Sequence, residues 1–64
     1  IEPVLALTRS YLELDRTDDA ERAVQRYLDK QPANAAALNL LGDVYIAAQK
    51  YPLALSQFQK AISL

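Results

Sequence analysis

Apolar residues recur along the chain at spacings of three and four, which is the spacing of one face of an α-helix. The first helix is predicted over about 3–15 and the third over about 35–48. The second runs from Thr17 to just before Pro32, and the fourth starts at Pro52, where a missing amide hydrogen costs nothing. No segment shows the alternation of a β-strand, so the pattern predicts an all-α protein.

Residues at the expected helix ends support these boundaries. Thr17 is predicted to cap the second helix, and Asp18 and Asp19 place negative charge in its first turn. Lys30 near the other end suits the negative pole of the helix. Asn34 is predicted to cap the third helix.

The sequence aligns with itself when it is shifted so that Leu7 falls on Leu41. The same shift places Tyr11 on Tyr45, Ala20 on Ala54, and Gln25 on Gln59. A repeat period of about 34 residues indicates stacked helical hairpins. It divides the chain into a first unit over 1–34 and a second over 35–64, which lacks a counterpart of Pro32. Since such arrays need about three units for stability, we expect a fragment of a longer array.

Small and aromatic side chains are assigned to packing between the helices. Gly42 and Ala54 are expected to face each other, because a larger side chain on either would push the helices apart. The aromatic residues at helical spacing are interpreted as core and inter-helix contacts rather than a base-stacking platform; they are Tyr11, Tyr45, Tyr51 and Phe58.

The chain resembles two tandem tetratricopeptide repeats. The second unit carries the family's residue types at its signature positions, although Leu38 stands where Trp is usual: Leu38, Leu41, Gly42, Tyr45, Ala54, Phe58 and Ala61. The first unit is degenerate, with Thr8, Val24 and Tyr27 in place of Gly, an aromatic residue and Ala. We expect small residues to make room for Tyr27: Ala33, Ala35, Ala36 and Ala37. The resemblance implies two antiparallel helix-turn-helix hairpins stacked as an α-solenoid, a right-handed superhelix.

This resemblance also implies a function, a scaffold or adaptor for protein–protein interaction. In such arrays a peptide or protein binds in the groove lined by the first helix of each repeat. The matching positions are Glu2, Leu5, Arg9, Leu12, Glu13, Ala36, Asn39, Asp43, Ile46 and Ala47. The apolar members suit apolar ligand side chains, and Asn39 can both donate to and accept from a peptide backbone. The alternative is that Arg9, Glu13 and Asp43 are a solvated face.

Catalysis is not expected from this composition. The chain has no His, no Cys and one Gly, so it offers no metal-ligand spacing and no phosphate-binding loop. The adjacent Asp18 and Asp19 point to different sides of a helix and are explained by its dipole. We expect no enzyme activity, no cofactor and no metal.

Nucleic acid is a weak alternative partner. Arg22, Arg26 and Lys30 form a basic ridge on the second helix, but Asp18 lies four positions before Arg22 and can pair with it. The net charge of −1 argues against nucleic acid or an anionic membrane as the main partner. No apolar run is long enough to cross a bilayer as a helix, so we expect no membrane insertion by this segment.

Self-association is the remaining alternative. Each hairpin covers only its neighbour, so apolar residues near the end of the chain have no cover, and exposed apolar ends favour association. These residues are Leu53, Leu55, Ile62 and Leu64. The bias toward Ala, Leu and Gln resembles degenerate repeat arrays of bacterial envelope and secretion proteins.

Overall fold

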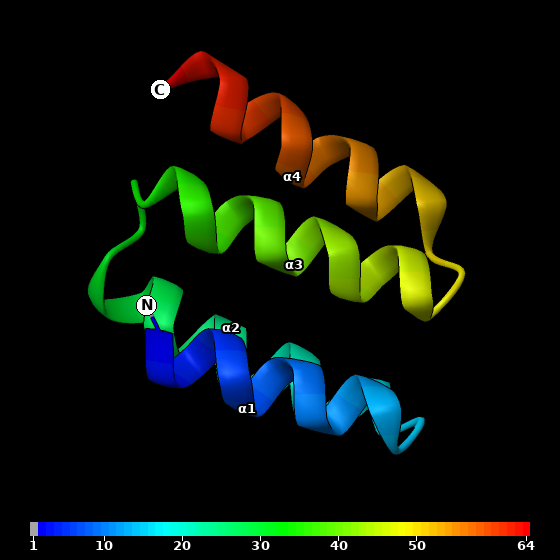
Figure 1. The fold of residues 1–64 in the computed structure, drawn as a ribbon. Helices are drawn as coiled ribbons and strands as arrows, with labels where there is room; N and C mark the ends of the chain where they lie inside the picture. Colours follow the sequence, from blue (N-terminus) through cyan, green and yellow to red (C-terminus); the bar gives the residue numbers. More distant parts are fainter. Residues whose placement is uncertain (1) are drawn as a thin grey trace.

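The computed structural model describes residues 2–64, with side chains from Pro3 onward. Within this range the chain forms four helices and no strand (Figure 1). They are α1 (Glu2–Glu13), α2 (Thr17–Lys30), α3 (Ala35–Ala47) and α4 (Tyr51–Ser63). The predicted all-α class and the four helices are confirmed, and the helix boundaries lie close to the predicted ones.

The helices form two antiparallel hairpins that stack on each other. α1 packs against α2 and α3 packs against α4, while α2 packs against α3 and joins the two hairpins. α1 also contacts α3, and Figure 1 shows these two helices running side by side in the same direction, with α2 behind α1. The result is a slab of 31 × 24 × 14 Å, and the predicted stack of helical hairpins is confirmed.

The two hairpin turns have the same geometry. Asp15 and Gln49 occupy equivalent positions and both adopt the left-handed conformation, with φ values of 58° and 62°. Each turn is closed by a backbone hydrogen bond of 2.8 Å, from Arg16 N–H to the Tyr11 carbonyl and from Lys50 N–H to the Tyr45 carbonyl. Such bonds satisfy carbonyl groups that the end of a helix leaves free.

One of the two predicted helix caps is wrong. Thr17 is the first residue of α2, and the cap position falls on Arg16, whose side chain makes no capping hydrogen bond. The reason lies in the turn, because its closing bond to Arg16 fixes where the helix can begin. The cap at Asn34 is confirmed, since the amide of Ala37 donates to Asn34 Oδ1 over 3.0 Å.

The core lies where α2, α3 and the inner faces of α1 and α4 meet. Its buried apolar residues are Ala20, Val24, Leu28, Ala37, Leu38, Leu40, Leu41, Val44, Tyr45 and Ala54. Tyr11 and Phe58 pack partly buried against this cluster, as predicted for core aromatics. Tyr51 is exposed, so the prediction that it packs in the core is wrong. It is the first residue of α4, at the end of the slab that faces solvent.

Gly42 approaches a different residue from the one expected. The three atoms nearest to a β-carbon built on Gly42 all belong to the ring of Phe58, rather than to Ala54. Ala54 is nevertheless buried, as a close helix pair requires. The small residue at position 42 therefore makes room for an aromatic ring on the facing helix.

Tyr27 is accommodated by polar contacts as well as by small residues. Ala37 is buried, but the other three alanines expected to make room for Tyr27 are exposed. The Tyr27 hydroxyl accepts a hydrogen bond from Asn34 Nδ2 over 3.3 Å. It also donates to Gln31 Oε1 over 3.4 Å. The hydroxyl thus lies at the surface, where the turn before α3 supplies partners.

Candidate protein-binding surface

The predicted groove residues lie on α1 and α3, and we call this surface the α1–α3 face. Leu5 and Leu12 are half-buried and pack against the core, so only part of each side chain is available to a ligand. Ile46 is 45% exposed. Ala36 and Ala47 are exposed and leave the backbone of α3 accessible. The side chain of Glu2 lies outside the described part of the structure.

The polar members of this face are exposed and unengaged. Among residues 3–64, the side chains of Arg9, Glu13, Asn39 and Asp43 form no hydrogen bond or ion pair within the chain. All four are exposed to solvent. Their donors and acceptors are therefore free to contact a ligand, at the cost of displacing water only.

The ten predicted positions line none of the four cavities found in residues 3–64. A partner on this face would therefore lie across the surface, where a small molecule would find little enclosure. This geometry suits a peptide or a protein surface.

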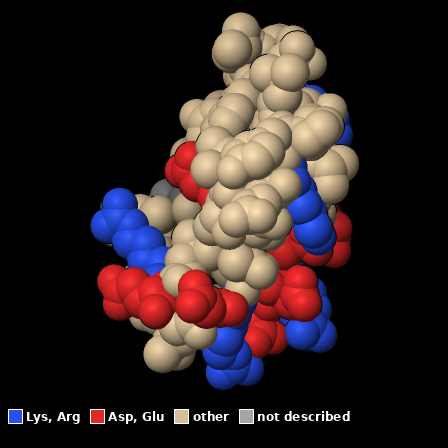
Figure 2. Space-filling model, turned by 90° about the vertical axis from the view of Figure 1, so that its right-hand side faces the viewer, with Lys and Arg blue, Asp and Glu red and all other residues tan. Residues whose placement is uncertain are grey.

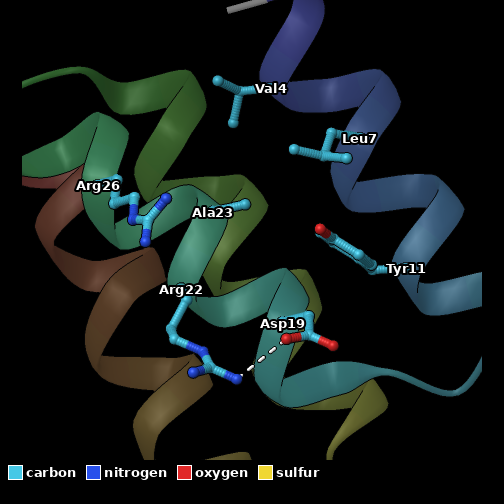
Figure 3. A pocket seen from close by; sticks show the side chains of 7 residues that line it. All are labelled: Val4, Leu7, Tyr11, Asp19, Arg22, Ala23 and Arg26. Atoms are coloured by element: carbon cyan, nitrogen blue, oxygen red, sulfur yellow. Dashed lines mark hydrogen bonds and ion pairs between the residues drawn. The ribbon is translucent and has the colours of Figure 1, made fainter.

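A cavity of about 290 Å³ lies at another place, between α1 and α2 (Figure 3). It is lined by Val4, Leu7, Tyr11, Asp19, Arg22, Ala23 and Arg26. Sequence reasoning did not assign a site here. The sequence shows only that Leu7 and Tyr11 align with Leu41 and Tyr45 one repeat later, and the structure shows that these two counterparts are buried.

Asp19 forms two ion pairs beside this cavity. Its carboxylate pairs with Arg16 over 2.7 Å and with Arg22 over 2.9 Å. The pairing expected between Asp18 and Arg22 is wrong, because Arg22 pairs with Asp19, whose carboxylate also pairs with Arg16 and is less exposed than that of Asp18. The Arg16 guanidinium also lies 5.4 Å from the centroid of the Tyr11 ring, in range of a cation–π contact.

Charge is distributed unevenly between the two hairpins. Residues 1–34 carry twelve of the fifteen charged side chains, and residues 35–64 carry only Asp43, Lys50 and Lys60. Figure 2 shows the result on one side of the molecule: acidic and basic side chains gather mostly at the lower part, and the upper part is almost uncharged. The second hairpin therefore offers mainly apolar and neutral contacts.

The contact between the hairpins includes one perturbed tyrosine. Burial raises the pKa of the Tyr45 hydroxyl above its usual value of 10.0, and the negative charge of Glu21 raises it further. Glu21 also lies 3.9 Å from Lys50 Nζ. Tyr45 therefore stays neutral at the interface between α2 and α3 to higher pH than an exposed phenol does.

Neither a metal site nor a membrane span is found in the described chain. No group of three or more acidic side chains in residues 3–64 is arranged to hold a metal ion. None of the helices α1 to α4 is long and apolar enough to cross a membrane.

Comparison with known proteins gives one match. A family model for the tetratricopeptide repeat matches residues 5–64, which include α2, α3 and α4 entirely and most of α1. No curated protein and no solved structure matches the chain. The match therefore gives the family of the chain and covers both hairpins, but it indicates no particular ligand.

Proposed function

Because the chain belongs to the tetratricopeptide repeat family, we propose that it is an adaptor segment that binds a peptide or a protein surface on its α1–α3 face. Tetratricopeptide repeats generally mediate protein–protein interaction. The observation that carries the proposal is the set of exposed, unengaged polar side chains beside a partly exposed Ile46 on two adjacent helices.

A ligand on this face would be held by hydrogen bonds, charged groups and apolar contacts at fixed positions. Asn39 can donate to a carbonyl and accept from an amide of an extended peptide. Arg9 and Asp43 carry opposite charges at equivalent positions of the two units and would fix the direction of a ligand. The exposed parts of Leu12 and Ile46 would receive apolar side chains.

No chemical step is part of this proposal. The family is typically a non-catalytic interaction module. The α1–α3 face contains no nucleophile with an adjacent base, and its two acidic residues in the described chain, Glu13 and Asp43, lie on different helices. We therefore expect neither enzyme activity nor a cofactor.

RNA is a less favoured partner. Of the three residues of the basic ridge, Arg22 is already paired with Asp19. Arg26 and Lys30 remain on α2 together with the acidic Asp29, so the local positive charge is small. Nucleic-acid binding would require more phosphate contacts than these residues supply. We expect no salt-sensitive binding of single-stranded RNA.

The proposal can be tested with peptides selected from a random-sequence library on the wild-type chain. Their affinity is measured by isothermal titration calorimetry for Arg9→Glu, Asn39→Ala and the control Gln25→Ala, which changes an exposed residue of α2. We expect both α1–α3 variants to bind about tenfold more weakly, a loss of about 1.4 kcal/mol each, and Gln25→Ala to bind normally. Equal affinity in all three variants would overturn the proposed surface.

A further inference from the structure

One end of the α1–α3 face coincides with the C-termini of its two helices. Glu13 and Ala47 occupy equivalent positions and are the last residues of α1 and α3. Both helices run in the same direction, so their C-termini lie at the same end of the slab, beside the two hairpin turns (Figure 1). Figure 2 views the molecule from this end. We call this part of the face the turn end, and it consists of Leu12, Glu13, Asp43, Ile46 and Ala47.

Two backbone carbonyls at the turn end have no partner within the described chain. The end of a helix leaves its last carbonyl groups without an intrahelical hydrogen bond. The bonds that close the turns occupy the carbonyls of Tyr11 and Tyr45. Among residues 2–64, no hydrogen bond reaches the carbonyl of Glu13 or that of Ala47. Both residues are exposed to solvent, so a ligand can donate to these carbonyls.

The last turns of α1 and α3 contain no basic residue, whereas those of α2 and α4 each contain a lysine. Arg16 and Lys50 follow α1 and α3 at equivalent positions, but both interact with carboxylates of α2. Arg16 pairs with Asp19 over 2.7 Å, and Lys50 Nζ lies 3.9 Å from Glu21. The negative poles of α1 and α3 therefore lack the cation that commonly stabilises the end of a helix.

Unpaired carboxylates add acceptors to the turn end. Glu13 on α1 and Asp43 on α3 are exposed, and neither forms an ion pair or a hydrogen bond through its side chain within residues 3–64. The same holds for Asp15 in the turn directly after α1. The turn end thus presents negative charge and hydrogen-bond acceptors, and none of its side chains is a donor.

An apolar pair lies beside these acceptors. Leu12 and Ile46 occupy equivalent positions, one residue before Glu13 and Ala47. Leu12 is half-buried and Ile46 is exposed. Lys and Arg side chains have an aliphatic stem and a charged head, so the stem can lie on an apolar surface while the head reaches polar groups nearby. The turn end can therefore contact both parts of a basic side chain.

We propose that the turn end binds a lysine or arginine side chain of the partner, so that the α1–α3 face recognises a basic, partly apolar segment of a protein. An ammonium or guanidinium group supplies only donors, which matches the acceptors of this surface. The contact also places a cation at the negative poles of two helices. Arg9 is left to contact an acceptor of the ligand, which sets the direction of the ligand. This inference rests on the proposed function and adds the chemistry of the partner to it.

Peptides selected on the wild-type chain from a random-sequence library test the charge of the partner. We expect the selected sequences to contain more Lys and Arg than the unselected library, next to apolar residues. One selected peptide is then compared with a version that carries Gln at every Lys and Arg position. Isothermal titration calorimetry is expected to show weaker binding of the Gln version. The affinity of the basic peptide alone is expected to fall as the salt concentration rises.

Glu13→Gln and Asp43→Asn remove the two charges with little change of shape. Each is expected to weaken binding of the basic peptide about threefold, as for a cation near an exposed helix end, and to leave binding of the Gln version unchanged. Asp29→Asn is the matched control. Asp29 is also exposed and forms no ion pair in the described chain, but it lies near the C-terminus of α2, at the other end of the slab (Figure 1). It is expected to leave both affinities unchanged.

The outcomes separate this inference from the proposed function. If Asn39→Ala weakens binding while Glu13→Gln and Asp43→Asn do not, the inference is overturned and the proposed function stands. Selected peptides without enrichment in Lys and Arg would have the same meaning. If Asn39→Ala and Ile46→Lys both leave binding unchanged, the peptides bind another surface, and the inference and the proposed function are both overturned.

Discussion

Gly42 and Phe58 pack with no room for a side chain between them, since a β-carbon on Gly42 would lie 2.5 Å from Cε1 of the ring. In the first hairpin the same two positions hold Thr8 and Val24, both fully buried. A larger residue on the first helix thus accompanies a smaller one on the second. Both combinations of side-chain sizes keep the two helices of a hairpin close together.

This exchange predicts a compensating pair of substitutions. Gly42→Thr is expected to lower the free energy of unfolding by about 1 to 3 kcal/mol, because the Phe58 ring must move. Adding Phe58→Val, which reproduces the pair of the first hairpin, is expected to recover most of the loss. Urea denaturation of the single and double variants measures the coupling. Strictly additive effects would show that the two side chains do not share this space.

Thr8 has a buried hydroxyl without a partner. Its side chain is fully buried, and Oγ1 makes no hydrogen bond among the described residues. A buried donor left unsatisfied costs about 1 to 3 kcal/mol. Thr8→Val keeps the shape and removes the hydroxyl, so it is expected to raise the free energy of unfolding by about 1 kcal/mol. Thermal melting should show no comparable gain for Thr17→Val at the start of α2.

The left-handed turn residues predict a stabilising change to glycine. Gln49 has a φ of 62°, a conformation that costs an L-residue about 1 to 2 kcal/mol, whereas glycine adopts it freely. After the larger entropy loss of glycine on folding, Gln49→Gly is expected to stabilise by about 0.5 to 1 kcal/mol. Gln59→Gly, in the interior of α4, is expected to destabilise by about 1 kcal/mol. A loss of stability from Gln49→Gly would contradict the turn geometry.

Tyr45 predicts a fall in stability at alkaline pH. Burial, and then the charge of Glu21, raise its pKa above 10.0 in the folded chain. The folded state therefore holds this proton at a pH where the unfolded state has lost it, and the stability that it contributes declines as the pH rises above 10.0. Tyr45→Phe is expected to flatten the decline in urea titrations, while Tyr51→Phe, the same change at an exposed site, should keep the wild-type profile.

Much of the fold follows from the sequence because its signals are periodic. The spacing of the apolar residues sets the helices, and the repeat period sets the hairpins, so neither depends on a single residue. The cap at Asn34 was predictable for a local reason, because a short polar side chain before a helix can accept a hydrogen bond from a free backbone N–H of the first turn. Thr17 has the same chemistry, but the backbone bonds of the preceding turn place the cap one residue earlier.

Side-chain partners were less predictable than the helices. Spacing along α2 allows Arg22 to pair with Asp18 or Asp19, and only the structure selects Asp19. Likewise, sequence pattern identifies Gly42 as a close-packing position without showing that Phe58 is what approaches it. The ten residues of the α1–α3 face stay a prediction, because their role depends on a ligand.

The most direct test of the central claim compares one substitution on two surfaces. Ile46 and Leu7 are both 45% exposed, Ile46 on the α1–α3 face and Leu7 at the cavity between α1 and α2. With a library-selected peptide, Ile46→Lys is expected to weaken binding about tenfold and Leu7→Lys to leave it unchanged. Binding that is lost in Leu7→Lys and kept in Ile46→Lys would contradict the account, because the partner would then bind beside that cavity.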